Sequence, residues 1–295
     1  MRIASVLHDA SLDKDGAPLL PVVALERDGA LYRVDELSRA LGATCAIGEP
    51  CDLGAAIALR GEAFREIDER VRSGERPSSA RLLPGTFTWL PPCDTERAAL
   101  LVCGADGAAS PDRGPSFRMA SARALLGHEA TVPVLADVSE IAVACAVAAV
   151  LGDDLFRATA REAEAAILGY TLMLSFDRAA GAQLGPSIVT RDECGSVVGL
   201  RAQIRVDGQP TSACEVSDHP LSPAETIAWI SHHAPLRAGD VIGALPLRSG
   251  SIDDRDPILR VPFGARVELA VERIGRLAGR PARGPEMRAW RLSPA

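Results

Sequence analysis

Apolar and polar residues near the start of the chain predict a β-hairpin followed by a helix. Two apolar segments, 20–25 and 30–34, flank Arg27-Asp28-Gly29, which is typical of a turn between antiparallel strands. A helix is expected over 35–41, and it should end at Gly42 because glycine commonly ends helices. These elements predict the first part of a small α+β unit.

A longer helix and a polar stretch are expected next. Apolar residues recur near helical spacing over 53–73, which predicts a helix there. The segment 74–84 is rich in proline, serine and glycine, so it is the best candidate for a linker.

Beyond residue 97 the apolar segments are mostly short and lie between turn residues, which predicts a β-rich second unit. The pair Asp207-Gly208 predicts a hairpin turn, because these residues accept positive φ angles. The candidate strands are 100–103, 141–151, 187–189, 197–206, 211–216, 240–245 and 265–274.

Two helices are expected among these strands. One is predicted over about 155–168, with Asp153 or Asp154 as its N-cap. The other begins at Ser222-Pro223-Ala224-Glu225, which forms a capping box with proline at the first helical position.

Composition excludes several classes of function. The net charge of −7, with no basic stripe, argues against nucleic-acid binding. The longest apolar run, 141–151, is too short to span a membrane, and the start lacks the apolar segment of a signal peptide. Seven cysteines without a Cys-x-x-Cys pair indicate neither a zinc site nor a disulfide framework, so a reduced, cytoplasmic protein is expected.

A series of short motifs runs through the second unit in a fixed order. They are the apolar run 141–152, Gly169-Tyr170-Thr171, the segment 185–193, Val206-Asp207-Gly208-Gln209 and the segment 236–242. In this order and at these intervals, the motifs resemble the fumarylacetoacetate hydrolase superfamily. The resemblance implies an α+β, β-rich fold, with a mixed β-sandwich or roll over 97–290 after a small N-terminal α+β domain over 1–92. It also implies a homodimer formed through the large domain.

In the resembled family, a Glu-x-Glu pair and an Asp hold a divalent ion, which polarises a dicarbonyl or enolate oxygen of a small keto acid. Counting from the neighbouring motifs, the Glu-x-Glu positions fall at Ala144 and Ala146. The Asp position falls at Ser175, or with an offset at Asp177. A methyl group cannot bind a metal ion, and the nearest carboxylate, Glu140, lies four to six residues early on a strand, roughly 13–20 Å away.

The other catalytic features of the resembled family are missing as well. The segment 104–111 lacks the family's His-x-x-Glu pair, and Gly243-Ala244-Leu245-Pro246 stands where the family has Thr-Gly-Thr-Pro. Lys14 is the only lysine, so no lysine can act in the second unit. The span 171–185 is short, which implies that a lid segment is absent.

The remaining polar residues supply candidates for a site without a metal or other cofactor. Asp177 is the only acid near the expected metal position, and His128-Glu129 could act as an acid/base pair, although turn residues are the plainer interpretation of both. The substrate-binding candidates are Ser175, Tyr170, Arg248 and Ser249. Arg248 and Ser249 follow the Pro246 loop, and their chemistry suits an anion.

Three hypotheses for function remain open at this stage. The first is a metal-independent enzyme that cyclises, isomerises, decarboxylates or hydrolyses a small carbonyl or β-dicarbonyl compound. The second is a non-catalytic pseudoenzyme that binds a small-molecule ligand or a partner protein. The third is a metal-dependent hydrolase with displaced ligands. Fold alone cannot decide among them, because function depends on the site.

Overall fold

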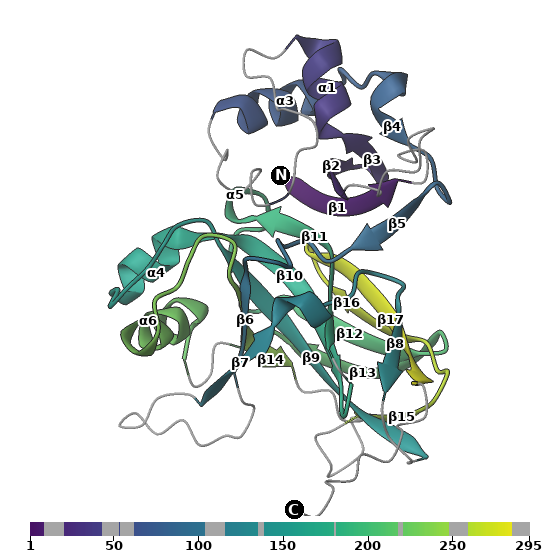
Figure 1. Cartoon of the computed structure of the whole chain (residues 1–295), viewed down its shortest axis with the longest axis vertical. Coiled ribbons are helices and arrows are strands. Elements are labelled where there is room, and N and C mark those ends of the chain that lie inside the picture. The colour runs from purple at the N-terminus through teal and green to yellow at the C-terminus, as the bar shows by residue number, and fades with distance from the viewer. Residues whose placement is uncertain are drawn as a thin grey trace, which may run out of the picture.

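Two β-sheets, each joined to short helices, form the fold (Figure 1). The computed structural model describes residues 1–8, 21–42, 53, 62–103, 116–134, 139–179, 181–217, 221–247 and 259–284. Within these residues the larger sheet has twelve strands and the smaller has five. None of the helices in these ranges is both long and apolar enough to cross a membrane.

The larger sheet runs in the order β4-β3-β2-β1-β11-β10-β9-β14-β6-β7, with β5 paired to β1 and β15 paired to β9. Its strands are β1 (Arg2–His8), β2 (Pro21–Arg27), β3 (Ala30–Arg33), β4 (Arg81–Leu82), β5 (Phe87–Leu90), β6 (Ala99–Cys103), β7 (Phe117–Ser121), β9 (Glu140–Leu151), β10 (Ile167–Phe176), β11 (Ala182–Thr190), β14 (Val241–Leu247) and β15 (Leu259–Pro262).

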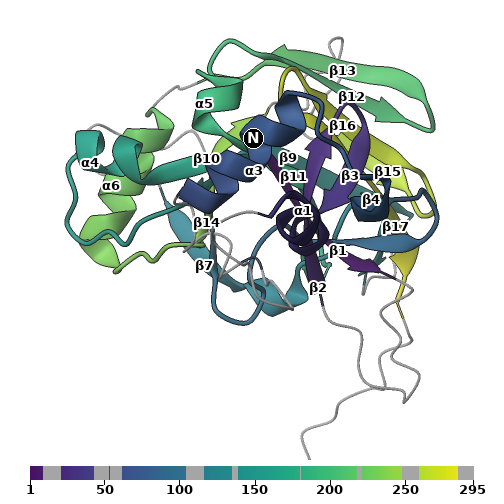
Figure 2. The ribbon, with the colours of Figure 1, turned by 90° about the horizontal axis from the view of Figure 1, so that it is seen from above.

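The smaller sheet runs in the order β13-β12-β16-β17-β8. Its strands are β8 (Thr131–Val134), β12 (Arg201–Val206), β13 (Gln209–Glu215), β16 (Val267–Val271) and β17 (Gly275–Arg283). The helices are α1 (Val34–Leu41), α3 (Glu62–Arg72), α4 (Ala160–Ala166), α5 (Arg191–Cys194) and α6 (Pro223–His233), with 3₁₀ turns η2 (Ser78–Ala80) and η3 (Ala122–Ala124). Seen from above, α4 and α6 lie on one side of the molecule, and β12 and β13 lie on the other (Figure 2).

The N-terminal unit confirms the predicted hairpin and helix. Strands β2 and β3 pair across the Asp28-Gly29 turn, and α1 ends at Gly42, whose φ of 63° is left-handed. The predicted linker over 74–84 is wrong, because this stretch contains η2 and β4, and β4 pairs with β3. The unpredicted strand β1 joins the two units, since it pairs with β2 on one edge and with β11 on the other.

Several details of the second unit differ from the expected elements. The N-cap of α4 is Thr159, not Asp153 or Asp154, because the Thr159 hydroxyl and the Glu162 carboxylate form a capping box. Asp154 instead accepts a hydrogen bond from the Ala238 N–H at 2.9 Å. Helix α4 ends at Ala166, before the predicted end at 168, and Ile167–Phe176 form β10. The predicted hairpin turn at Asp207-Gly208 is confirmed, with φ angles of 48° and 81°.

Apart from Glu140 at its start, strand β9 consists of apolar residues, as expected for a strand that is buried on both faces over most of its length. On one face, Val143, Cys145 and Val147 belong to the core between the two sheets. On the other face, Ala146 and Ala148 belong to a second buried cluster, which also contains Phe64 and Ile67 of α3 and Leu37 of α1. The β-rich α+β fold with a small N-terminal α+β unit agrees with the prediction.

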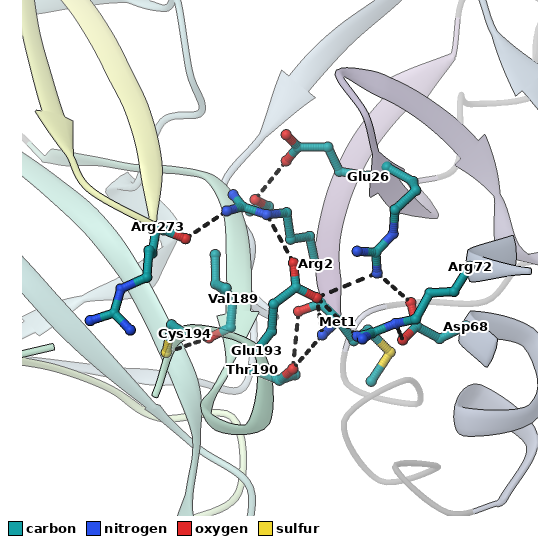
Figure 3. Close-up of polar contacts among 12 residues, drawn as sticks. Met1, Arg2, Glu26, Asp68, Arg72, Val189, Thr190, Glu193, Cys194 and Arg273 are labelled. Carbon is teal, nitrogen blue, oxygen red and sulfur yellow. Dashed lines mark hydrogen bonds and ion pairs between the residues drawn. The ribbon is translucent and has the colours of Figure 1, made fainter. Parts of the chain in front are cut away.

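An ionic cluster also joins the two units (Figure 3). The carboxylate of Glu193, in α5, accepts contacts from the Met1 ammonium at 2.5 Å, Arg27 at 3.3 Å and Arg72 at 3.0 Å. Asp68, in α3, binds both Arg27 and Arg72. The cluster thus ties β1, β2 and α3 to the segment that follows β11.

Candidate functional site

The three positions that the resemblance assigns to metal ligands lie close together on β9 and β10. Ala144 is paired directly with Ser175, and Ala146 with Met173. Side chains of directly paired residues project to the same face of a sheet, and this face repeats every second residue. We call this surface, made of Ala142, Ala144, Ala146, Met173 and Ser175, the alanine face.

The alanine face has a buried inner part and an accessible outer part. Ala146 and Met173 are 4% and 3% exposed, respectively, whereas Ala144 is exposed and Ser175 is half-buried. The Met173 side chain also closes the space over β14, since a Cβ on Gly243 would lie 2.8 Å from the Met173 Cε. The inner part is therefore packed with apolar atoms, and only the outer part can meet a ligand.

Ala144 lies where one neighbouring strand ends and another begins. Strand β14 pairs with β9 as far as Leu247, opposite Cys145, and β15 starts at Leu259, opposite Val143. Arg248 and Ser249 come directly after β14 but lie outside the described residues, so their role in anion binding stays a prediction.

The start of β14 is fixed by a buried acid that holds two segments together. The Asp240 carboxylate accepts hydrogen bonds from the N–H groups of Ala99 at 2.7 Å and Arg237 at 2.8 Å. Burial raises the pKa of Asp240 above its ordinary value, although both hydrogen bonds oppose the shift. This bridge aligns β14 with β6 and so places Gly243 beneath Met173.

Asp177 lies beside the outer part of the alanine face. Its N–H donates to the Ala142 carbonyl at 2.9 Å, which continues the pairing of β10 with β9 by one residue. Its side chain is 64% exposed, and the carboxylate lies 3.7 Å from the Arg178 Nε. Residues 176–181 alone connect the paired residues Ser175 and Ala182, in keeping with the short span expected from the sequence.

The structure does not bring Tyr170 to the alanine face. Tyr170 occupies the alternate face of β10, is 7% exposed and belongs to the core between the two sheets. Burial raises the pKa of its hydroxyl to about 12, so the group is neutral near pH 7. From this position it can support β10 but cannot reach Ser175 on the other face.

His128 and Glu129 adjoin each other, but other partners hold both. The His128 Nδ1 accepts a hydrogen bond from the Ala278 N–H at 3.0 Å, and its ring packs edge-on against Trp89 with the ring centroids 5.5 Å apart. The Glu129 carboxylate lies 3.7 Å from the His128 Nε2 and 2.6 Å from the Arg266 guanidinium. These contacts place the pair against β17 and β5, on elements that contribute nothing to the alanine face.

Protein stability is expected to fall in mild acid because of His128. Burial lowers the pKa of this histidine below its ordinary value. Unfolded chains therefore bind a proton at about pH 6.5, before folded ones do, so stability present above about pH 6.5 is lost as the pH falls. We expect His128→Gln, which keeps an acceptor for Ala278, to weaken this dependence in thermal melts between about pH 7.5 and 5.5. An unchanged dependence would contradict the assignment.

Two buried cysteines, Cys103 on β6 and Cys145 on β9, are poor nucleophiles. Burial raises the pKa of Cys103 to about 11 and that of Cys145 to about 12. Both remain neutral thiols near pH 7, and the thiolate is the nucleophilic form.

Arg260 is a polar residue of the site that the sequence patterns did not identify. It lies on β15 directly opposite Ala142, and its side chain is exposed. The buried neighbours Leu259 and Val261 project to the other face, so Arg260 shares the alanine face. The only available signal was the Leu-Arg-Val-Pro alternation, and its pairing with β9 is visible only in the folded chain.

The fold and this arrangement define the class of protein. The chain belongs to the fumarylacetoacetate hydrolase family, whose C-terminal domain profile matches residues 103–177 and 175–280. A comparison with curated protein sequences found no significant match.

Solved structures with the same fold include three enzymes. Maleylpyruvate hydrolase from Sphingobium sp. SYK-6 has 16% identity and a TM-score of 0.70, with 96% of this chain and 100% of that chain covered. Fumarylacetoacetate hydrolase from Exiguobacterium antarcticum has 15% identity, a TM-score of 0.70 and the same coverage. 5-Carboxymethyl-2-hydroxymuconate delta-isomerase from Mycobacterium smegmatis has 18% identity and a TM-score of 0.62, with 97% and 100% covered. Another structure of the first enzyme contains manganese(II) and pyruvate.

The divalent ion that the family implies does not fit the residues of the alanine face. Mg²⁺ and related ions need several oxygen ligands, but Ala144 and Ala146 offer none and Ser175 offers one neutral hydroxyl. In the part of the chain that the structure describes, no three His, Cys, Asp or Glu side chains are grouped so that they could hold a metal ion. The residues present therefore do not support a catalytic step through a metal.

Proposed function

We propose that this chain is a metal-independent enzyme that acts on a small carbonyl or β-dicarbonyl compound at the outer part of the alanine face. One observation carries the proposal: both expected carboxylate positions are alanine, yet Ala144 is exposed and Ser175 is half-buried. A small ligand can therefore reach this position, which in the resembled family carries the metal-binding carboxylates. Cyclisation, isomerisation, decarboxylation and C–C hydrolysis are all reactions of such compounds.

Isomerisation makes the least demand on the residues present. The Asp177 carboxylate would remove a proton from the carbon next to the carbonyl, and the Ser175 hydroxyl would donate a hydrogen bond to the enolate oxygen. In a substrate with a double bond next to that carbon, the enolate extends into a dienolate, and Asp177 would return the proton to the far carbon of the dienolate. The proton that is removed is the one returned, so the step needs no co-reactant. The names of the relatives support this class, since they include an isomerase and hydrolases of small acids.

Activity should survive removal of metal ions and should depend on Asp177. We expect purified protein to contain no stoichiometric divalent ion by elemental analysis, and turnover of β-dicarbonyl acids, followed by ultraviolet absorbance, to be unchanged by EDTA. Asp177→Asn should lower kcat about a hundredfold, as is usual when a general base is lost. Activity abolished by EDTA and restored by Mg²⁺ or Mn²⁺ would instead support a metal-dependent hydrolase with displaced ligands.

The main alternative is a pseudoenzyme that binds a ligand or partner protein, and the packed inner part around Met173 favours it. Binding of β-dicarbonyl acids without turnover would support this alternative. We also propose that the protein forms the homodimer that the family implies and that it is located in the cytoplasm. The function needs no nucleic acid and no membrane.

A further inference from the structure

Among the residues that the structure describes, Arg260 is a cation that strand pairing places at the alanine face. Arg260 is paired with Ala142, so Ala144 is its diagonal neighbour on β9. Diagonal neighbours across paired strands lie about 7–8 Å apart at Cα, which a long side chain can span. Ala142 and Ala144 end at Cβ, so no bulky side chain of β9 stands between Arg260 and Ser175.

Among the described residues on and next to β9 and β10, two acids share the face of Arg260, and both are exposed. Glu140 is the other diagonal neighbour of Arg260 on β9. Asp177 lies next to Ala142 on the opposite side of β9 from Arg260, and its carboxylate is close to Arg178. Arg260 has a contact of its own in the free protein, so an anionic ligand would join or replace an existing partner. The guanidinium stays charged across the physiological range and presents paired N–H donors that match a carboxylate.

We propose that Arg260 binds the carboxylate of the substrate and supplies the positive charge at the alanine face. This inference rests on the proposed function and narrows its substrate class to small keto acids that carry a carboxylate, rather than neutral dicarbonyl compounds. Arg260 is exposed on a surface strand, so its replacement removes charge without disturbing the core.

A pair of matched probes tests this role. Acetopyruvate and acetylacetone share a β-dicarbonyl group, and only acetopyruvate carries a carboxylate. Titration calorimetry should show that Arg260→Gln weakens acetopyruvate binding about ten- to a hundredfold, the loss usual for a hydrogen-bonded charged pair, and leaves acetylacetone unaffected. Arg260→Lys keeps the positive charge but loses the paired N–H donors of the guanidinium. Its affinity for acetopyruvate should therefore lie between those of the wild type and Arg260→Gln. If the protein converts acetopyruvate to a product, the variants are compared by their KM for acetopyruvate and not by Kd.

The control is Arg201→Gln, which removes an exposed arginine of β12 in the smaller sheet and should change neither probe. Equal losses for both probes, no loss for acetopyruvate, or no acetopyruvate binding by the wild type would each overturn the inference. Arg260-dependent binding without turnover would keep the inference and refute the enzymatic proposal. Turnover of acetopyruvate that is unaffected by Arg260→Gln would support the enzymatic proposal and overturn the role of Arg260.

Discussion

Replacement of Ala146 by glutamate is expected to destabilise the protein strongly, whereas the same change at Ala144 should be tolerated. Ala146 is 4% exposed and paired with Met173, so a carboxylate there would be buried among apolar atoms. Burial of an ionisable group without a partner costs several kcal/mol, paid either as desolvation or as protonation of the acid. Ala144 is exposed on the same strand and face, so its substitution is a matched control.

Urea unfolding gives the comparison directly. We expect Ala146→Glu to lower the free energy of unfolding by about 3 kcal/mol or more, and Ala144→Glu by less than about 0.5 kcal/mol. Similar losses at the two positions would contradict the division of the alanine face into packed and accessible parts. The double variant should not gain family-like hydrolysis, since the His-x-x-Glu pair and Thr-Gly-Thr-Pro loop are absent too.

The elements that could be predicted from the sequence depend on local chemistry. The Asp207-Gly208 turn needs only the freedom of these residues to take positive φ angles. The start of α6 needs only the Ser222 hydroxyl and the Glu225 carboxylate, and both capping hydrogen bonds are present. Such signals lie within four residues of each other, so no knowledge of the partner strands was required.

The elements that were missed depend on distant pairing. The predicted helix extends to residue 168, but Ile167 and Leu168 begin β10, which pairs with β9 on one side and β11 on the other. The segment 74–84 has the composition of a linker, but its Leu82 pairs with Leu31 and is buried. In both cases the tertiary partner decides the structure, and local propensity does not.

The site was predictable in part for the same reason. Motif spacing identified Ala144 and Ser175, and the register of β9 and β10 places them directly opposite each other. Tyr170 belongs to the motif from which Ser175 was counted, but it lies five positions before Ser175. Because five is odd, the two side chains project to opposite faces of the strand. Arg260 lies more than a hundred positions from Ala142 in the chain, and only the β15–β9 pairing joins them.

Replacement of Glu193 by glutamine should show how strongly the two units are held together. Burial alone would raise the pKa of Glu193, but the Met1 ammonium and the Arg27 and Arg2 guanidinium groups outweigh it and lower the pKa. The side chain is 18% exposed and several of its partners are partly exposed, so solvent weakens these ion pairs. We expect Glu193→Gln to lower the free energy of unfolding by about 2 kcal/mol, which should reduce the Tm by several degrees.

The pH dependence separates this ionic contribution from simple packing loss. Because the folded state lowers the pKa of Glu193, its stabilisation is present above the unfolded value of about 4.3 and is lost as the pH falls through the lower folded value. Wild type and Glu193→Gln should therefore differ in thermal melts near neutral pH and converge in acid. Glu75→Gln, at the exposed Arg70–Glu75 pair, should match the wild type throughout. A Glu193→Gln deficit that persists unchanged at low pH would show that packing, and not charge, explains the contribution of this residue.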